Sequence, residues 1–163
     1  MATKIFDFEA EFAASLPGTY ALMLSANLRV HPHVSRVFLH GSRGPKGGFR
    51  SDSDVDLSLI VDTPRVGDIE SDLCAVVKTT LDHWQASVEA DLAVVFDLQN
   101  CSLKCFDQMT WNEQICPSGG TDCFGLYKIQ KGFQGLVTNG GVRVKLMYPC
   151  LKIWQHRSIF FLT

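Results

Sequence analysis

The sequence predicts an α+β fold in which helices pack on a mixed β-sheet. Three apolar runs, at residues 34–40, 57–61 and 92–96, have the length and the branched side chains of buried strands. A segment with the apolar spacing of a helix joins the second run to the third, which makes a strand–helix–strand unit. These features indicate a sheet with at least one parallel pair of strands and a helix on one face.

The composition suits one compact domain that covers residues 1–163. The chain has a formal net charge of −2, and 46% of its residues are hydrophobic, which is enough for a real core. We expect the core of the domain at about residues 19–97. The remainder, at about 98–163, is expected to be an extension that contains a β-hairpin.

Two short helices are expected before the first strand, at residues 6–15 and 19–30. Pro17 and Gly18 separate them, because proline and glycine interrupt a helical pattern. The apolar side chains of the second helix are expected to pack against the sheet; they include Leu22, Leu24 and Leu28.

A turn at His31-Pro32-His33 precedes the first strand at residues 34–40. Two histidines this close raise the question of a metal site, but the proline between them favours an exposed bend, so we discount a metal there. His40 ends the strand. We expect it to be a packed histidine rather than a phosphate contact.

A core-facing helix is expected between the second and third strands. Asp68 suits its N-cap, and Glu70 and Asp72 in its first turn complement the positive end of the helix dipole. Apolar residues follow at helical spacing: Ile69, Leu73, Val76, Val77, Leu81 and Trp84.

Beyond residue 97 the pattern predicts a helix at residues 103–114 and then a β-hairpin. The hairpin strands, at 136–138 and 142–146, flank Asn139-Gly140-Gly141, which is a strong signal for a tight turn. Apolar residues alternate with two cations in the second of these strands. It is therefore expected to have one apolar and one basic face.

Charge is divided unevenly along the chain. Residues 124–163 carry six Lys and Arg side chains and no acid (+6), whereas the rest carries nine cations against all seventeen acids (−8). Such segregation suggests a binding partner. One interpretation is that the basic part contacts a nucleoside triphosphate or a nucleic-acid acceptor. The other, which we favour, is that it lies against the acidic part of its own molecule and is anchored there by its aromatic side chains.

The cysteines are interpreted as plain thiols. Four of the six fall between residues 101 and 123, but none forms the Cys-x-x-Cys pair usual for structural zinc. A zinc-supported adaptor is the alternative. The cysteines are Cys74, Cys101, Cys105, Cys116, Cys123 and Cys150.

Neither a secretory signal nor a membrane span is expected. The first fourteen residues carry Asp7, Glu9 and Glu11 and have no basic start and no apolar run. No segment approaches the roughly 18 consecutive apolar residues of a membrane helix. We expect a cytoplasmic protein with reduced thiols and no membrane association.

Two aspartates stand at the start of the second strand, with one apolar residue between them. Side chains at i and i+2 of a strand point to the same face, so Asp54 and Asp56 converge while Val55 turns into the core. Two adjacent carboxylates repel each other, and a hard divalent cation such as magnesium relieves that repulsion. The alternative is a solvated glycine-rich hairpin. It explains Asp52 but explains the other two poorly, because the strand continues directly after them.

A Gly-Ser pair ends the first strand, twelve positions before these aspartates. Gly41 lets the backbone approach a phosphate closely, and Ser42 offers an amide and a hydroxyl. A short helical turn after them would direct backbone N–H groups at an anion. Arg43, Lys46 and Arg50 in the following loop are candidates to neutralise a triphosphate or a pyrophosphate leaving group. A solvated basic loop is the alternative for each of them.

A third carboxylate lies near the start of the third strand. Asp91 is followed by five apolar residues, and a charge at the start of a buried strand is costly unless it is paired or bound to metal. Glu89 is on the same face two residues earlier and is the less favoured substitute. Three carboxylates suit a site with two metal ions that hold the attacking and leaving oxygens.

Together these residues resemble the DNA polymerase β-type nucleotidyltransferase superfamily, in particular its small stand-alone members. The resemblance covers about residues 35–97. In the family pattern, an apolar strand is followed by Gly-Ser, and about ten residues later Asp-x-Asp stands at a second strand. A further acidic residue follows on a third strand. The positions that match are Gly41, Ser42, Asp54, Asp56 and Asp91, with Arg43, Gly44 and Ser53 at common accessory positions. The resemblance implies a polymerase β palm-like nucleotidyltransferase fold.

The resemblance also implies an activity. The chain would be a magnesium-dependent enzyme, with manganese as a substitute, that transfers a nucleoside monophosphate, AMP from ATP, to an acceptor hydroxyl. Asp54 and Asp56 would hold two metal ions, and Asp91 would complete the site of the catalytic ion and take the hydroxyl proton. Ser42 and the amides near Gly41 would hold the β and γ phosphates. The chemistry would be mainly positioning and charge neutralisation.

The resemblance does not identify the acceptor, which could be a small molecule, a protein or RNA. Members of the family modify antibiotics, adenylylate partner proteins or extend RNA. The alternative function is a non-catalytic nucleotide-binding or antitoxin-like partner-binding module on the same fold. Its mark would be a missing carboxylate, and all three are present. A homodimer or a partner protein is also expected by analogy, since isolated domains of this kind often borrow surface from a second subunit.

Overall fold

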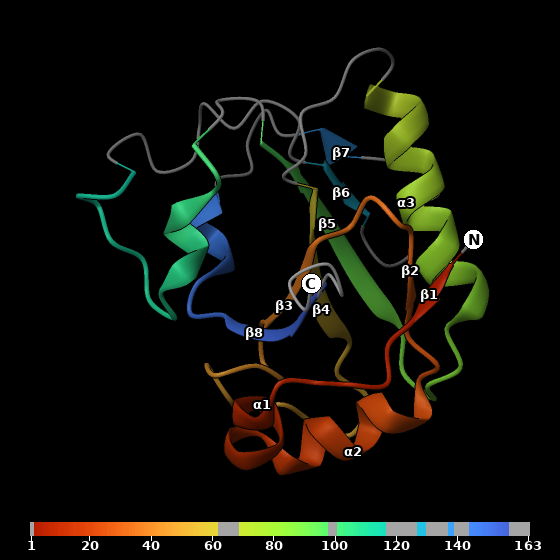
Figure 1. The fold of residues 1–163 in the computed structure, drawn as a ribbon. Coiled ribbons are helices and arrows are strands. Elements are labelled where there is room, and N and C mark those ends of the chain that lie inside the picture. The colour runs from red at the N-terminus through yellow and green to blue at the C-terminus, as the bar shows by residue number, and fades with distance from the viewer. Residues whose placement is uncertain are drawn as a thin grey trace, which may run out of the picture.

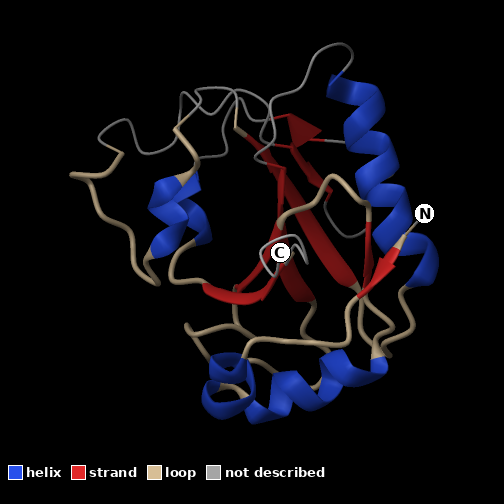
Figure 2. Cartoon of the chain, in the orientation of Figure 1, coloured by secondary structure: helices blue, strands red, loops and turns tan. Residues whose placement is uncertain are grey.

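The computed structural model describes residues 2–61, 69–97, 101–116, 127–129, 137–138 and 144–156. Within these residues, a six-stranded mixed sheet has the strand order β7-β6-β5-β4-β3-β8, and a separate two-stranded sheet pairs β1 with β2. Helices flank the large sheet, as Figures 1 and 2 show. The predicted α+β class with a mixed sheet is confirmed.

The three predicted strands form the centre of the large sheet. β3 (Arg36–His40) pairs antiparallel with β4 (Val55–Val61), and β4 pairs parallel with β5 (Ala90–Phe96). The connection between the two parallel strands contains α3 (Ile69–His83). The strand–helix–strand unit is therefore present as predicted, and the proposed N-cap of its helix, Asp68, lies outside the described residues.

Further strands extend the sheet on both sides. β8 (Leu151–Gln155) pairs antiparallel with β3, at a position where the sequence pattern predicts no strand. On the other side, β6 (Tyr127–Ile129) pairs with β5, and β7 (Val137–Thr138) pairs with β6. The extension that follows β5 thus completes the sheet on both edges.

The N-terminal segment differs from its prediction at several helix ends, and the first helix, expected at residues 6–15, begins at Ala10. α1 (Ala10–Ser15) and α2 (Pro17–Ser25) are separated by Leu16 alone, because proline is well tolerated in the first turn of a helix and Pro17 begins α2 instead of preceding it. The second helix was expected to continue to residue 30 and ends at Ser25. The chain then forms β2 (Arg29–Val30), which pairs with β1 (Thr3–Lys4).

Asn27 explains why α2 stops early. Its φ of 54° lies in the left-handed region, which asparagine tolerates better than most residues and which ends a helix. Its side-chain amide donates to the backbone carbonyl of His83 at 3.2 Å. The end of α2 is thereby attached to the end of α3.

The two faces of the large sheet have separate cores. One face buries alternate residues of the central strands, including Leu39, Leu57 and Leu92, against the N-terminal segment and α3. The opposite face buries Phe38 and Ile60 with side chains of the extension, namely Leu103, Cys105, Phe106, Val144, Met147 and Cys150. Figure 1 shows α3 on one side of the sheet and the short helices of the extension on the other.

Two predictions for the extension are wrong. Residues 103–114 were expected to be α-helical, but only Lys104–Asp107 are helical there, as the 3-10 helix η1. Val144–Met147 form a second 3-10 helix, η3, where a strand was expected at 142–146. In a 3-10 helix residues three apart share a face, so Val144 and Met147 are both buried while Leu146 is 67% exposed. The predicted turn at 139–141 lies outside the described residues.

The described part of the basic extension lies against the rest of the molecule. Lys152 Nζ is 3.7 Å from Glu9 Oε1, and Lys145 Nζ is 3.7 Å from Glu113 Oε1. Trp154 is buried in β8, and Tyr148 packs on Phe106. Residues 144–156 therefore favour the interpretation of intramolecular packing. None of the helices in the described residues is both long enough and apolar enough to cross a membrane.

Candidate active site

Two of the predicted carboxylates lie side by side on the sheet. Asp56 in β4 and Asp91 in β5 are directly paired in the parallel register, so their side chains leave the same face of the sheet. Both are half-buried. Asp54 immediately precedes β4, two residues before Asp56, and is also half-buried. Glu89, the less favoured substitute for Asp91, is exposed and precedes β5.

The Gly-Ser turn lies against this pair. β3 ends at His40, which is paired with Asp56, and Gly41 follows with a φ of 70° in the left-handed region. A Cβ atom on Gly41 would overlap the Asp56 carboxylate and would be 2.8 Å from its Cγ atom. Glycine is therefore required at position 41 both by its backbone conformation and by the close carboxylate.

The turn after Gly41 is compact. The amide of Gly44 donates to the carbonyl of Gly41 at 3.0 Å, and the amide of Gly47 donates to that of Gly44 at 3.1 Å. A Cβ atom on Gly44 would come within 2.9 Å of the His40 backbone, which explains a second glycine there. Ser42 lies in this turn and is half-buried. These backbone turns agree with the predicted short helical turn.

The side chain of Arg43 is hydrogen-bonded to backbone carbonyls of the loop and is not exposed to a ligand. Its Nε donates to the carbonyl of Ser53 at 2.8 Å, and its NH2 donates to the carbonyls of Arg50 and Ser51, each at 3.2 Å. Its guanidinium also lies 4.6 Å from the ring centroid of Phe49. The expectation that Arg43 contacts phosphate stays a prediction, and the described contacts give it a structural role in the loop.

The other two cations of the loop are exposed. Arg50 has a side chain that is 86% exposed and a loose ion pair of 3.9 Å with Asp52, and Lys46 is exposed as well. Both cations are therefore accessible to solvent. Their roles as nucleotide contacts stay predictions.

Replacing Arg43 with lysine is expected to lower the free energy of unfolding by about 1.5–3 kcal/mol. Lysine cannot reproduce the fork of donors that reaches three carbonyls from a side chain that is almost fully buried. Urea denaturation measures the change. Arg50→Lys is the matched control and is expected to change stability by less than about 0.5 kcal/mol, since its side chain is exposed. Equal losses in the two variants would contradict the structural role of Arg43.

A pocket lies on the same face of the sheet as the carboxylates. Phe38 is two residues before His40 and therefore shares its face, and Phe38 lines a pocket of about 460 Å³ together with Phe106, Met109 and Lys152. None of the predicted site residues is among the described residues that line it. The pocket therefore shares a face of the sheet with the candidate site and does not contain it.

The closest group of potential metal ligands is not the aspartate group. Among the described residues, one set of three or more His, Cys, Asp or Glu side chains has ligand atoms that all lie within 4.8 Å of one another, and it consists of His31, His33 and Asp72. Asp54, Asp56 and Asp91 are brought to one face but not that close together. The sequence interpretation discounted a metal at the two histidines. Asp72 lies 39 residues after His33, so its proximity to them is apparent only in the fold.

The described cysteines favour the interpretation as plain thiols. Cys105 and Cys150 are buried, and burial raises the pKa of Cys105 to about 11 and that of Cys150 to about 12. Burial of this kind is typical of structural thiols rather than reactive ones. The hydroxyl of Tyr148 donates to the carbonyl of Cys105 at 2.6 Å, and burial raises the pKa of this tyrosine too. Cys123 lies outside the described residues.

Comparisons with protein-family models, with curated proteins and with solved structures find no match for this chain. The resemblance to nucleotidyltransferases therefore depends on the sequence motif alone.

Proposed function

We propose that this protein is a metal-dependent nucleotidyltransferase that moves AMP from ATP to an acceptor hydroxyl. The observation that carries the proposal is the direct pairing of Asp56 with Asp91 on neighbouring parallel strands, with the Gly41 turn against Asp56. The order of the central elements supports it as well. An antiparallel pair is followed by a helix and a parallel strand, and the functional side chains lie on the face opposite that helix.

The donor set fits magnesium. Magnesium prefers oxygen ligands and is bound in proteins by one or two carboxylates together with substrate phosphates. Asp54, Asp56 and Asp91 would hold two magnesium ions, and manganese would serve as a substitute. When bound, the ions supply neutralisation of the charge that develops on the phosphate oxygens.

The chain's own residues have separate roles in the proposal. The backbone amides of the turn after Gly41 and the hydroxyl of Ser42 bind the β and γ phosphates. Asp91 accepts the proton of the acceptor hydroxyl, and Lys46 and Arg50 neutralise the leaving pyrophosphate. Arg43 maintains the shape of the loop that carries both cations.

The acceptor classes are a small molecule, a protein and RNA. The pocket on the same face of the sheet as the carboxylates has a lining of mixed charge, because Glu9, Asp107 and Lys152 all line it. A uniformly basic surface, which a nucleic-acid acceptor would favour, is not what these side chains present. An acceptor with both polar and apolar groups agrees best with the lining.

A second candidate function has one observation in its favour. The three aspartates do not form a group as close as the His31, His33 and Asp72 group, which is compatible with a fold that binds a nucleotide or a partner protein without catalysis. Such a module would bind ATP with magnesium and release no pyrophosphate with any acceptor.

The test of function is to incubate the protein with ATP labelled at the α-phosphate, magnesium and cell extract, and to identify the molecule that becomes labelled. The double variant Asp54→Asn/Asp56→Asn is expected to lose labelling. Asp52→Asn is the matched control, because its side chain is 82% exposed in the same loop, and it is expected to label as the wild type does.

The outcomes separate the two candidate functions. Labelling by the wild type that disappears in the double variant supports transfer. Nucleotide binding without labelling in any extract favours the binding module. If the wild type neither labels an acceptor nor binds ATP with magnesium, both candidates fail.

A further inference from the structure

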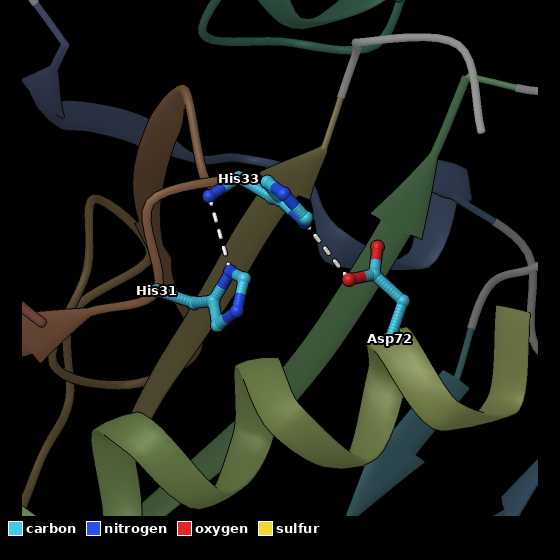
Figure 3. A group of neighbouring side chains, drawn as sticks. All are labelled: His31, His33 and Asp72. Carbon is cyan, nitrogen blue, oxygen red and sulfur yellow. Dashed lines mark hydrogen bonds and ion pairs between the residues drawn. The ribbon is translucent and has the colours of Figure 1, made fainter. Parts of the chain in front are cut away.

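Three potential metal ligands converge where the turn between β2 and β3 meets α3. His31 and His33 belong to the turn, and Asp72 belongs to the N-terminal part of α3. One ligand atom from each residue can be chosen so that all three lie within 4.8 Å of one another. Figure 3 shows both rings above the helix and the carboxylate of Asp72 directed toward His33.

The positions of these side chains are fixed by local contacts. His33 Nδ1 is 2.9 Å from Asp72 Oδ1, and the two imidazole rings pack edge to face with centroids 4.5 Å apart. The backbone amide of His33 donates to His31 Nδ1 at 3.1 Å, and that of Val34 donates to the carbonyl of His31 at 2.9 Å. Pro32 restricts the backbone between the two histidines. The group is thus largely preorganised.

The group is also accessible. The side chain of His33 is 42% exposed and that of Asp72 is 14% exposed, so ions and water reach the histidine while the carboxylate is largely covered. Pro32 and His33 line a surface pocket of about 310 Å³. The exposed side chain of His33 provides the path of entry that a metal site needs.

We propose that His31, His33 and Asp72 bind a divalent transition-metal ion, with zinc as the favoured ion. Two imidazole nitrogens and one carboxylate oxygen are a common zinc ligand set, in which water takes the fourth position. Ligand atoms at zinc bonding distance are about 3.3 Å apart in a tetrahedral site. The ligand atoms of His33 and Asp72 are 2.9 Å apart, which is already close to that spacing. A ligand atom of His31 lies within 4.8 Å of the ligand atoms of both residues, so a small change in its side-chain conformation brings it to that spacing.

The ligand chemistry separates this site from the magnesium site of the proposed function. Magnesium prefers oxygen ligands, whereas imidazole suits zinc, copper and nickel. The two sites also lie at opposite ends of β3, because His33 precedes the strand and Gly41 follows it. The five residues of the strand span roughly 17 Å. If zinc does not bind at His31, His33 and Asp72, the proposed magnesium site is unaffected, and the reverse also holds.

A bound ion would attach the turn before β3 to α3 more firmly than the hydrogen bond between His33 and Asp72 does. This turn directs the chain into the strand that ends at the candidate active site. In the proposal, a bound zinc ion stabilises the folded state according to its affinity and concentration.

The test titrates zinc into the metal-free full-length chain in the presence of excess magnesium, and follows binding by calorimetry and by the shift in Tm. One zinc ion per chain is expected to bind and to raise Tm. His33→Ala and Asp72→Asn are expected to weaken zinc binding at least about tenfold, since loss of an outer-shell partner alone costs about 10–100-fold. His83→Ala is the matched control, because this half-buried histidine ends α3 and its ring nitrogen Nδ1 lies 2.8 Å from the carbonyl of Thr79, away from the three ligands in the sequence. It is expected to leave zinc affinity unchanged.

Two results would overturn the proposal. One is a wild-type chain that binds no zinc when magnesium is in excess. The other is zinc binding of equal strength in the wild type, His33→Ala and Asp72→Asn, which would place the ion elsewhere, such as on the cysteines that every variant retains. If His33→Ala does not fold, Asp72→Asn decides the question, since asparagine keeps the size of the side chain and the acceptor oxygen that faces His33.

Discussion

Replacing Asp91 with asparagine is expected to lower the rate of magnesium-dependent pyrophosphate release from ATP at least about 100-fold, which is the scale of losing one preorganised electrostatic contact to the reacting groups. The same change is expected to alter the free energy of unfolding by no more than about 1 kcal/mol, because asparagine has nearly the same size as aspartate and the like charge of Asp56 lies directly opposite. Activity and stability would thus respond very differently. That difference is the mark of a functional carboxylate.

Glu89→Gln is the matched control for this prediction. Glu89 lies two residues before Asp91 and is exposed, and its backbone carbonyl accepts from the amide of Val55 at 2.9 Å. It is expected to retain the wild-type rate. A pyrophosphate assay and urea denaturation on the same preparations provide both measurements. If Asp91→Asn unfolds the chain, or if it is as active as Glu89→Gln, the assignment of Asp91 to the reaction is wrong.

The centre of the fold could be predicted because its signals are local. β3, β4 and β5 are nearly continuous apolar runs of five to seven residues, and α3 has apolar residues at helical spacing with Leu73, Val76 and Val77 buried. The shared face of Asp56 and Asp91 also follows once the parallel register is assumed. Leu81, which the same spacing places in the core, is 37% exposed because it lies near the end of the helix.

The extension could not be predicted because its structure depends on distant partners. β8 exists as a strand because Leu151 pairs with Leu39 and Trp154 pairs with Val37, and neither its length nor its sequence identifies it alone. The alternation at 142–146 was compatible with a strand, yet burial of Val144 and Met147 against Phe106 favours a helical turn. In both cases tertiary packing overrides a weak local preference.

The roles of single side chains at the candidate site were equally dependent on packing. A cation after Gly-Ser is a reasonable phosphate contact in the sequence, but the fold closes the loop so that the carbonyls of Arg50, Ser51 and Ser53 surround Arg43. Likewise, Asp72 is simply an acid in the first turn of a helix until the fold brings it to His33, 39 residues earlier. Local patterns identify the type of residue, and long-range contacts decide its function.

Replacing Gly41 with alanine is expected to lower the free energy of unfolding by about 2–5 kcal/mol and to abolish nucleotide binding. About 1–2 kcal/mol of this comes from holding a residue with a Cβ atom at a φ of 70°. A further 1–3 kcal/mol, roughly, comes from the overlap of the new methyl group with the Asp56 carboxylate. Urea denaturation measures the stability, and equilibrium binding of a fluorescent ATP analogue with magnesium measures the second effect.

Gly47→Ala separates these two contributions. Gly47 has a φ of 75°, close to that of Gly41, but a Cβ atom there meets nothing within 4 Å. It should therefore lose only about 1–2 kcal/mol and retain nucleotide binding. A double-mutant cycle isolates the overlap, because Asp56→Ser removes the carboxylate and should make Gly41→Ala less costly by roughly 1 kcal/mol or more. Equal destabilisation by Gly41→Ala in the presence and absence of the Asp56 carboxylate would mean that the turn does not lie against it, and the geometry on which the proposed phosphate site depends would be wrong.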